Sequence, residues 1–182
     1  MAKQRLTAKN IIKKLNLVPL PVEGGMFSLT YTTKEKIAQS ALPKRYKEDK
    51  TFSGAIYYFL TDDLDSFSAM HKLPTDETYH FYLGDPVEML LLHPRGRSER
   101  VILGHDILGD QIVQFTVKRG VWMGSRVKKG GKFALMGTTM APGFTPSDYR
   151  GGKRETLIAK YPDEADLITQ LTRPGALLRM TE

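Results

Sequence analysis

The segment from Ser66 to Pro86 carries the residues best suited to chemistry in this chain. A strand-like run ends in His71, Glu77 follows a short polar turn, and Gly84 closes the next strand-like run. Two β-strands joined by such a turn can aim an imidazole and a carboxylate into one pocket. The pair would then be a metal half-site, an acid–base pair or a buried hydrogen-bonded pair. The spacing indicates a pocket and leaves its chemistry open.

Side chains alternate between two faces along the strand expected from Glu77 onward. An inward-facing Glu77 brings Tyr79 and Phe81 to the same interior wall and turns His80 to the opposite face. Glu77 is therefore a candidate catalytic residue with Tyr79 beside it, and Phe81 is a candidate ligand contact. His80 is expected to be structural, for example at a subunit contact, and is only a weak candidate metal ligand.

The preceding strand, residues 67–71, should follow the same rule. An inward His71 implies that Phe67 and Ala69 also face inward, where they would contact a ligand. Trp122, the only tryptophan, adjoins the expected pocket rim, and Met123 follows it, so that both are candidate ligand contacts. His71 is a candidate catalytic base, and with Glu77 it is a weak candidate metal ligand.

Size and composition point to one soluble globular domain. The chain has 182 residues, of which 41% are hydrophobic and 26% charged, and a chain of this length can bury a substantial core. We expect a single domain over residues 1–182 with its core at about 17–163. No apolar run approaches the ~20 residues that span a bilayer. The absence of cysteine fits a reducing cytosol, and the N-terminal residues lack the apolar stretch of a signal peptide.

The formal net charge of +7 raises the question of an anionic partner. Lysine and arginine lie in scattered groups within residues 34–47, 95–100 and 128–132. This distribution favours a solvated basic surface, and the alternative is an electrostatic funnel for a phosphorylated or carboxylated small molecule. No recognition motif supports nucleic-acid binding.

From residue 52 onward the pattern is almost entirely β. Apolar or alternating runs separated by Gly, Pro and Asp turns predict strands over residues 55–60, 67–71, 78–83, 87–92, 99–103, 112–117 and 133–140. Helical spacing predicts an N-terminal helix over residues 6–17 and C-terminal helices over 154–160 and 163–171. Many short strands with little helix between them are typical of a sandwich or barrel. The polar stretch 34–51 is long for a loop and suggests a lid, a dimer arm or a disordered excursion.

These residues resemble the cupin superfamily, and within it a branch known as a domain of unknown function (cupin-5 type). The resemblance covers about residues 17–163. It rests on recurrent pieces of sequence, namely 23–25 with Phe27 and Tyr31, 55–60, 67–71, 76–86, 120–122 and 141–144.

The general cupin metal pattern is incomplete in this chain. The resemblance assigns His71 and Glu77 to two of the four ligand places, but Leu73 and Met123 occupy the other two. A thioether is a poor ligand for hard divalent metals. We therefore expect no cofactor, with a divalent metal as the less favoured alternative.

The resemblance implies an all-β, double-stranded β-helix (jelly-roll) barrel, usually a homodimer, with a ligand pocket at one end. The branch is similar to cupin sugar-nucleotide epimerases, which work without metal and use an inward His as base and a Tyr as acid. By that analogy His71 would be the base and Tyr79 the acid. The resulting hypothesis is a cytoplasmic small-molecule-binding cupin, possibly a metal-independent isomerase or epimerase of a carbohydrate-like or nucleotide-sugar ligand. A non-catalytic binding cupin and a metal-dependent cupin enzyme remain alternatives, and neither nucleic acid nor membrane is expected as a partner.

Overall fold

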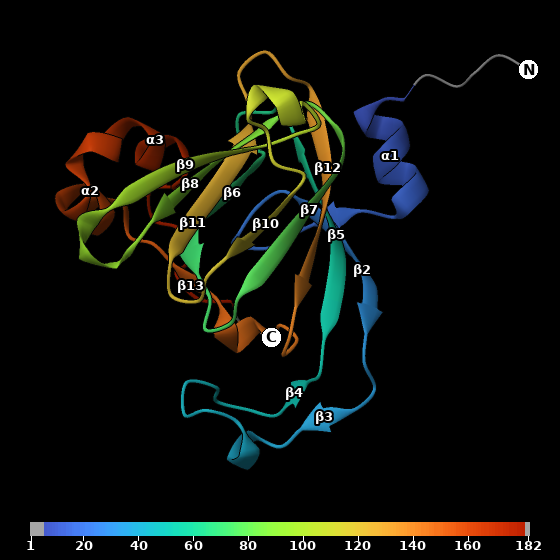
Figure 1. Cartoon of the computed structure of the whole chain (residues 1–182), viewed down its shortest axis with the longest axis vertical. Helices are drawn as coiled ribbons and strands as arrows, with labels where there is room; N and C mark the ends of the chain where they lie inside the picture. The colour runs from blue at the N-terminus through green and yellow to red at the C-terminus, as the bar shows by residue number, and fades with distance from the viewer. Residues whose placement is uncertain (1–5, 181–182) are drawn as a thin grey trace, which may run out of the picture.

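The computed structural model describes residues 6–180 and contains two large antiparallel β-sheets (Figure 1). The first sheet has the order β1-β2-β5-β12-β7-β10, with bounds Val18–Pro19, Met26–Thr32, Gly54–Thr61, Phe133–Met140, Glu77–Gly84 and Gln114–Val117. The second has the order β13-β6-β11-β8-β9, with bounds Arg150–Gly151, Phe67–Lys72, Trp122–Val127, Val87–Leu92 and Ser98–Leu103. Together they form the expected all-β jelly roll.

Alternating side chains of the two sheets meet in a shared core. On β5, Tyr58 and Leu60 point into it, and on β8 it receives Val87, Met89 and Leu91. All five are almost fully buried. Burial of this apolar surface, worth about 25 cal/mol per Å² removed from water, holds the sheets together.

Helices cover the outer faces of both sheets, at opposite sides of the molecule (Figure 1). Helix α1 (Ala8–Leu15) packs Ile11 against the first sheet. It begins at Thr7, whose side chain accepts a hydrogen bond from the Asn10 N–H. Helices α2 (Arg154–Lys160) and α3 (Ala165–Gln170) cover the outer residues of β8. Apart from Glu88, strand β8 is apolar on both faces because both are covered. Among residues 6–180, no helix is both long and apolar enough to cross a membrane.

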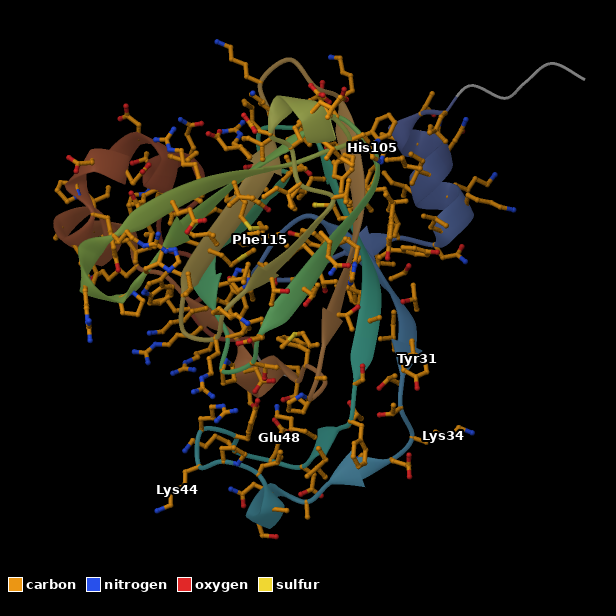
Figure 2. The ribbon with its side chains drawn as sticks, in the orientation of Figure 1. Tyr31, Lys34, Lys44, Glu48, His105 and Phe115 are labelled. Atoms are coloured by element: carbon orange, nitrogen blue, oxygen red, sulfur yellow. The ribbon has the colours of Figure 1, made fainter. Side chains whose placement is uncertain are left out.

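The strand predictions for 87–92 and 133–140 are confirmed at both ends, and the prediction for 112–117 begins two residues early. The segment 34–51, here called the arm, contains β3 (Lys36–Ile37), a 3₁₀ turn (Gln39–Ala41) and β4 (Lys50–Thr51). It projects from the end of the barrel, with Lys34 and Lys44 on its outer side (Figures 1 and 2).

Candidate functional site

A cavity of about 460 Å³ opens at the end of the barrel nearest the arm. Its walls are mostly apolar side chains from β2, β5, β7 and β12, from the turn before β2 and from residues 144–146 and 177–180. Five polar residues line it and have little exposure to solvent: Glu23, Tyr58, Glu77, Tyr79 and Thr138. An apolar cavity with a few convergent polar groups is the usual form of a small-molecule site.

Strand β7 places Glu77 and Tyr79 side by side on the cavity wall. Their partners on β12 are Met140 and Thr138. The sequence expectation that these two residues share an interior face agrees with this register. Phe81 continues the same face into the core but does not line the cavity, contrary to the expected ligand contact.

His80 points away from the cavity, as its parity on β7 predicts. Its Nε2 lies 3.2 Å from the Thr139 hydroxyl, and its ring stacks on Tyr82. Neither partner lines the cavity. His80 is therefore not placed to complete a metal site with His71 and Glu77.

A β-bulge interrupts β6 where the sequence predicts a regular pleat. Met123 of β11 pairs with His71, yet Ser125 pairs with Ser68, so that β6 has one extra residue in this interval. Such an insertion exchanges the faces of the side chains beyond it. Ser68 and His71 consequently both point toward the Glu23 side chain.

The bulge makes one sequence expectation wrong, namely that Phe67 and Ala69 share a face with His71. Both belong to the outer cluster beneath the C-terminal helices. The Phe67 ring also lies under the Arg173 guanidinium, 4.0 Å from its carbon. Neither residue lines the cavity, and a ligand there would not contact them.

The two bulged residues offer backbone N–H groups that the strand ladder does not use. The Ala69 N–H donates to the Glu23 carbonyl at 2.8 Å, and the Met70 N–H donates to the Leu171 carbonyl at 2.8 Å. The bulge therefore anchors the turn that carries Glu23. Through Met70, the bulge also contacts Leu171 at the end of α3.

Glu23, which sequence reasoning did not assign to the site, lies in a tight and strained turn. Its N–H donates to the Pro21 carbonyl at 2.7 Å, and Val22 between them has φ +67°, a rare backbone conformation for a β-branched residue. Gly24 follows at φ +96°, where a Cβ would lie 2.4 Å from the Phe67 carbonyl oxygen. The turn thus requires glycine at this position, and strain of this kind collects at functional sites.

The Glu23 carboxyl contacts two residues of β6. Its Oε1 accepts a hydrogen bond from Ser68 Oγ at 3.0 Å, and its Oε2 lies 3.9 Å from His71 Nε2. The His71 Nδ1 lies 2.8 Å from the Ala69 carbonyl oxygen. A carbonyl only accepts, so Nδ1 carries the proton and the Nε2 of the neutral imidazole presents its lone pair toward Glu23.

His71 is 1% exposed and is absent from the cavity wall. Its ring stacks on Tyr149 with centroids 5.1 Å apart. Burial lowers the pKa of His71, and the nearby Glu77 offsets this only in part. The imidazole is therefore kept neutral, and it lies against Glu23 without lining the cavity.

Burial shifts both carboxyl groups toward their protonated forms. Burial raises the pKa of Glu23 to about 7, opposed by its hydrogen bonds to Ser68 and Tyr58. Burial also raises the pKa of Glu77 to about 7, with a further rise from Glu23 and opposing effects from His71, Thr138 and Tyr79. A carboxyl group with such a pKa exchanges protons readily near neutral pH, which suits a general acid or base.

The tyrosine hydroxyls keep their protons. Burial and the neighbouring carboxyl groups raise the pKa of Tyr58 and of Tyr79 well above 10. The Tyr58 hydroxyl donates to the Gly24 carbonyl at 3.0 Å. The Tyr79 hydroxyl faces the Met123 sulfur at 3.7 Å, a weak acceptor, and it also interacts with the Glu77 carboxyl.

Of the two residues expected at the rim of the pocket, neither lines the cavity. Met123 lies behind the wall, 1% exposed, with its sulfur against Ser68 and Tyr79. Trp122 points outward, and its ring lies 4.5 Å from the Lys72 ammonium. The expectation that Trp122 contacts a ligand in this cavity is wrong because the alternation of β11 turns it to the other face.

The residues present do not fit the metal centre that the cupin pattern implies. Two of its four ligand places hold Leu73 and Met123, and residues 6–180 contain no group of three or more His, Cys, Asp or Glu side chains arranged for an ion. His71 Nδ1 is also committed to a backbone carbonyl. We therefore derive no step through a metal.

Metal content provides a direct check of this donor set. After reconstitution with Fe, Mn, Ni or Zn and desalting, we expect less than about one tenth equivalent of bound ion by elemental analysis, because a Leu and a Met replace two ligands. One equivalent that is lost on Glu77→Gln substitution would contradict this expectation.

Comparison with known proteins agrees with the fold and the motifs. The family model of the Cupin superfamily (DUF985) matches residues 9–151. A crystal structure of a Shewanella oneidensis protein superimposes with a TM-score of 0.81 at 28% identity, covering 93% of this chain and 99% of that chain. A hypothetical protein from Leishmania major gives 0.79 at 27% identity, with 92% and 99% covered.

More distant structures share the fold alone. A cupin 2 conserved barrel domain protein from Rhodopseudomonas palustris gives a TM-score of 0.53 at 10% identity, covering 91% of this chain and 86% of that chain. No protein with a curated description matches significantly. Since the family model matches most of the chain, this protein belongs to the Cupin superfamily (DUF985) family.

Proposed function

We propose that the cavity binds a carbohydrate-like small molecule and that Glu77 and Tyr79 move a proton on it, as a metal-independent isomerase or epimerase would. The observation that carries the proposal is that two carboxyl groups and two tyrosine side chains line one mostly apolar cavity of about 460 Å³. A purely structural polar cluster would not need an open space beside it.

In the proposed step, the Glu77 carboxylate takes a proton from a carbon next to a carbonyl group. The electrons of the broken C–H bond move toward the carbonyl oxygen, where the Tyr79 hydroxyl donates a hydrogen bond to the developing charge. Return of the Glu77 proton to the former carbonyl carbon, while the neighbouring hydroxyl passes its proton to the former carbonyl oxygen, gives the isomer. A solvent proton delivered to the opposite face of the original carbon gives the epimer, and Glu77 then releases its proton to solvent. Nothing is consumed, so the step requires no further reactant.

Glu23 and His71 have supporting roles in this proposal. The protonated Glu23 carboxyl lies on the cavity wall and also faces His71 Nε2 at 3.9 Å. We place His71 behind Glu23, where it orients that carboxyl. This changes the sequence hypothesis, in which His71 itself was the base, because His71 does not line the cavity.

Solvent deuterium exchange tests this proposal without knowledge of the product. Ketose, aldose and nucleotide-sugar panels would be incubated with the protein in D₂O, and loss of the C–H signal beside the carbonyl would be followed by NMR. We expect exchange with the wild-type protein and at least about 100-fold slower exchange with Glu77→Gln, a loss typical of a missing general base. The exposed Glu35→Gln is the matched control.

Each outcome has a definite meaning. Exchange that survives unchanged in Glu77→Gln overturns the assigned base. Calorimetric binding of a panel member that never exchanges its protons favours the non-catalytic binding cupin instead. Tyr79→Phe should slow exchange without abolishing binding, because it removes only the donated hydrogen bond.

A further inference from the structure

A second open space, a cleft of about 440 Å³, lies next to the cavity and is strongly basic. Among residues 6–180, its one acidic lining residue is Asp148, whose carboxylate already pairs with the buried Lys50 at 2.8 Å. Six cationic side chains surround it: Arg45, Lys47, Lys72, Arg119, Arg150 and Arg179. The cleft therefore presents a concentrated positive field.

Within residues 6–180, none of these six side chains takes part in an ion pair. Arg45 donates to two neutral acceptors, the Pro74 carbonyl and the Tyr46 hydroxyl. Burial lowers the pKa of Lys72, and the like charges of Arg150 and Lys160 lower it further. Crowding of like charges destabilises a folded chain, and a bound anion would relieve it.

The cleft and the cavity adjoin along a thin wall. Leu73 lines both spaces. Two segments then contribute neighbouring residues to opposite sides: Pro146 faces the cavity and Ser147 the cleft, while Met180 faces the cavity and Arg179 the cleft. A single small molecule could thus reach from one space to the other around this wall.

We propose that the cleft binds the phosphoryl groups of a small molecule whose uncharged part enters the cavity. The planar guanidinium of arginine matches phosphate oxygens in a bidentate manner, and four of the six cations are arginines. Six positive charges exceed what a single carboxylate would neutralise, which favours a diphosphate or another multiply charged group. The link to the cavity rests on the proposed function, whereas anion binding by the cleft does not.

Calorimetry with inorganic pyrophosphate and orthophosphate at about 0.15 M salt tests the site, because screening at this ionic strength suppresses diffuse surface attraction. We expect one pyrophosphate per chain. The triple variant Arg119→Gln, Arg150→Gln, Arg179→Gln should weaken it at least about tenfold, since it removes three charge-assisted donors. All three residues are exposed, so the substitutions should not disturb folding.

Two controls separate the possible explanations. The triple variant Lys13→Gln, Lys128→Gln, Lys129→Gln removes the same charge from exposed positions elsewhere, and it should change affinity less than about twofold. Glu77→Gln should bind pyrophosphate like the wild-type protein, because Glu77 lines the cavity and not the cleft. Pyrophosphate binding therefore tests the cleft even if the proposed chemistry in the cavity is wrong.

Three results would overturn the proposal. The first is no pyrophosphate binding at millimolar concentration. The second is an equal loss in both triple variants, which would show general charge attraction. The third is tight binding of a single-stranded oligonucleotide by a protein that ignores pyrophosphate, which would make the cleft part of a nucleic-acid surface.

Discussion

Substitution of the buried Lys50 by methionine will lower the free energy of unfolding by about 3–5 kcal/mol, because it leaves a buried carboxylate without its counter-ion. The Lys50 side chain is 0% exposed and its Nζ lies 2.8 Å from Asp148 Oδ2, itself 3% exposed. Lys50 also donates to the Thr145 hydroxyl. Urea unfolding followed by circular dichroism measures the loss.

A double-mutant cycle with Asp148→Asn isolates the ion pair from the packing of the methionine. The double variant should be more stable than the sum of the two single losses predicts, because neither partner is then left charged and alone. The exposed pair of Lys118 and Asp76, with side chains 71% and 43% exposed, is the matched control. Lys118→Met should reduce stability by less than about 1 kcal/mol, and an equal loss at both pairs would contradict the argument.

The ion pair between Lys50 and Asp148 holds the arm in place beside the cavity. Lys50 lies at the end of the arm, and Thr51 next to it lines the cavity. On the other side, Asp148 follows Pro146, which also lines the cavity. Figure 2 shows Glu48 on the arm, and its carboxylate accepts a hydrogen bond from the Thr145 hydroxyl at 2.8 Å. Loss of the pair should therefore weaken ligand binding as well as folding.

The Glu23 carboxyl will make stability fall as pH rises from about 4.5 to 7. Its pKa has the ordinary value of 4.5 in the unfolded chain and about 7 in the folded protein. Between these values the folded state holds a proton that the unfolded state has released, so its contribution is complete below pH 4.5 and is lost as pH passes 7. A shift of this size corresponds to roughly 3 kcal/mol at most.

Comparison of Glu23→Gln with the wild-type protein measures this contribution, because other titrating groups largely cancel in the difference. The variant should gain stability relative to the wild-type protein between pH 5 and pH 8. Glu77→Gln should behave similarly, and the double variant should gain less than the sum because Glu23 raises the pKa of Glu77. A difference that stays constant with pH would contradict the buried acid pair.

His71 acts in the opposite direction in the wild-type protein. Its pKa is lowered by burial, so its contribution is present above its ordinary value of 6.5 and is lost as pH falls through the folded value. Below pH 6.5, the free energy of unfolding of the wild-type protein should therefore change less with pH than the two carboxyl groups alone would cause. A His71→Gln variant should restore the steeper slope.

The sequence predicted the β-architecture well because most strands obey one simple rule. Strands with covered outer faces are mostly apolar, as in 87–92, where Glu88 is the exception, and interior strands alternate, as in 77–83. Glu77 and Tyr79 could be assigned to one wall because β7 keeps its pleat at these positions. The helix over residues 6–17 was also recognisable, since Thr7 supplies the cap.

The remainder of the site depends on features without a local sequence signal. The bulge in β6 is visible only in the pairing with β11, and it reversed the faces expected for Phe67 and Ala69. Glu23 reaches the site because a turn brings it against a strand distant in sequence. A glutamate before Gly24 and Gly25, in a segment otherwise poor in charge, was the one clue to its role.

The bulge of β6 also has a consequence for the order of assembly during synthesis. Its two spare amide donors receive partners from opposite ends of the chain, the Glu23 carbonyl and the Leu171 carbonyl. A nascent chain that ends before residue 171 still has the strands of both sheets, but one buried donor lacks its acceptor, a deficit of about 1–3 kcal/mol. The pocket should therefore acquire its final shape only after the last helix has left the ribosome and docked.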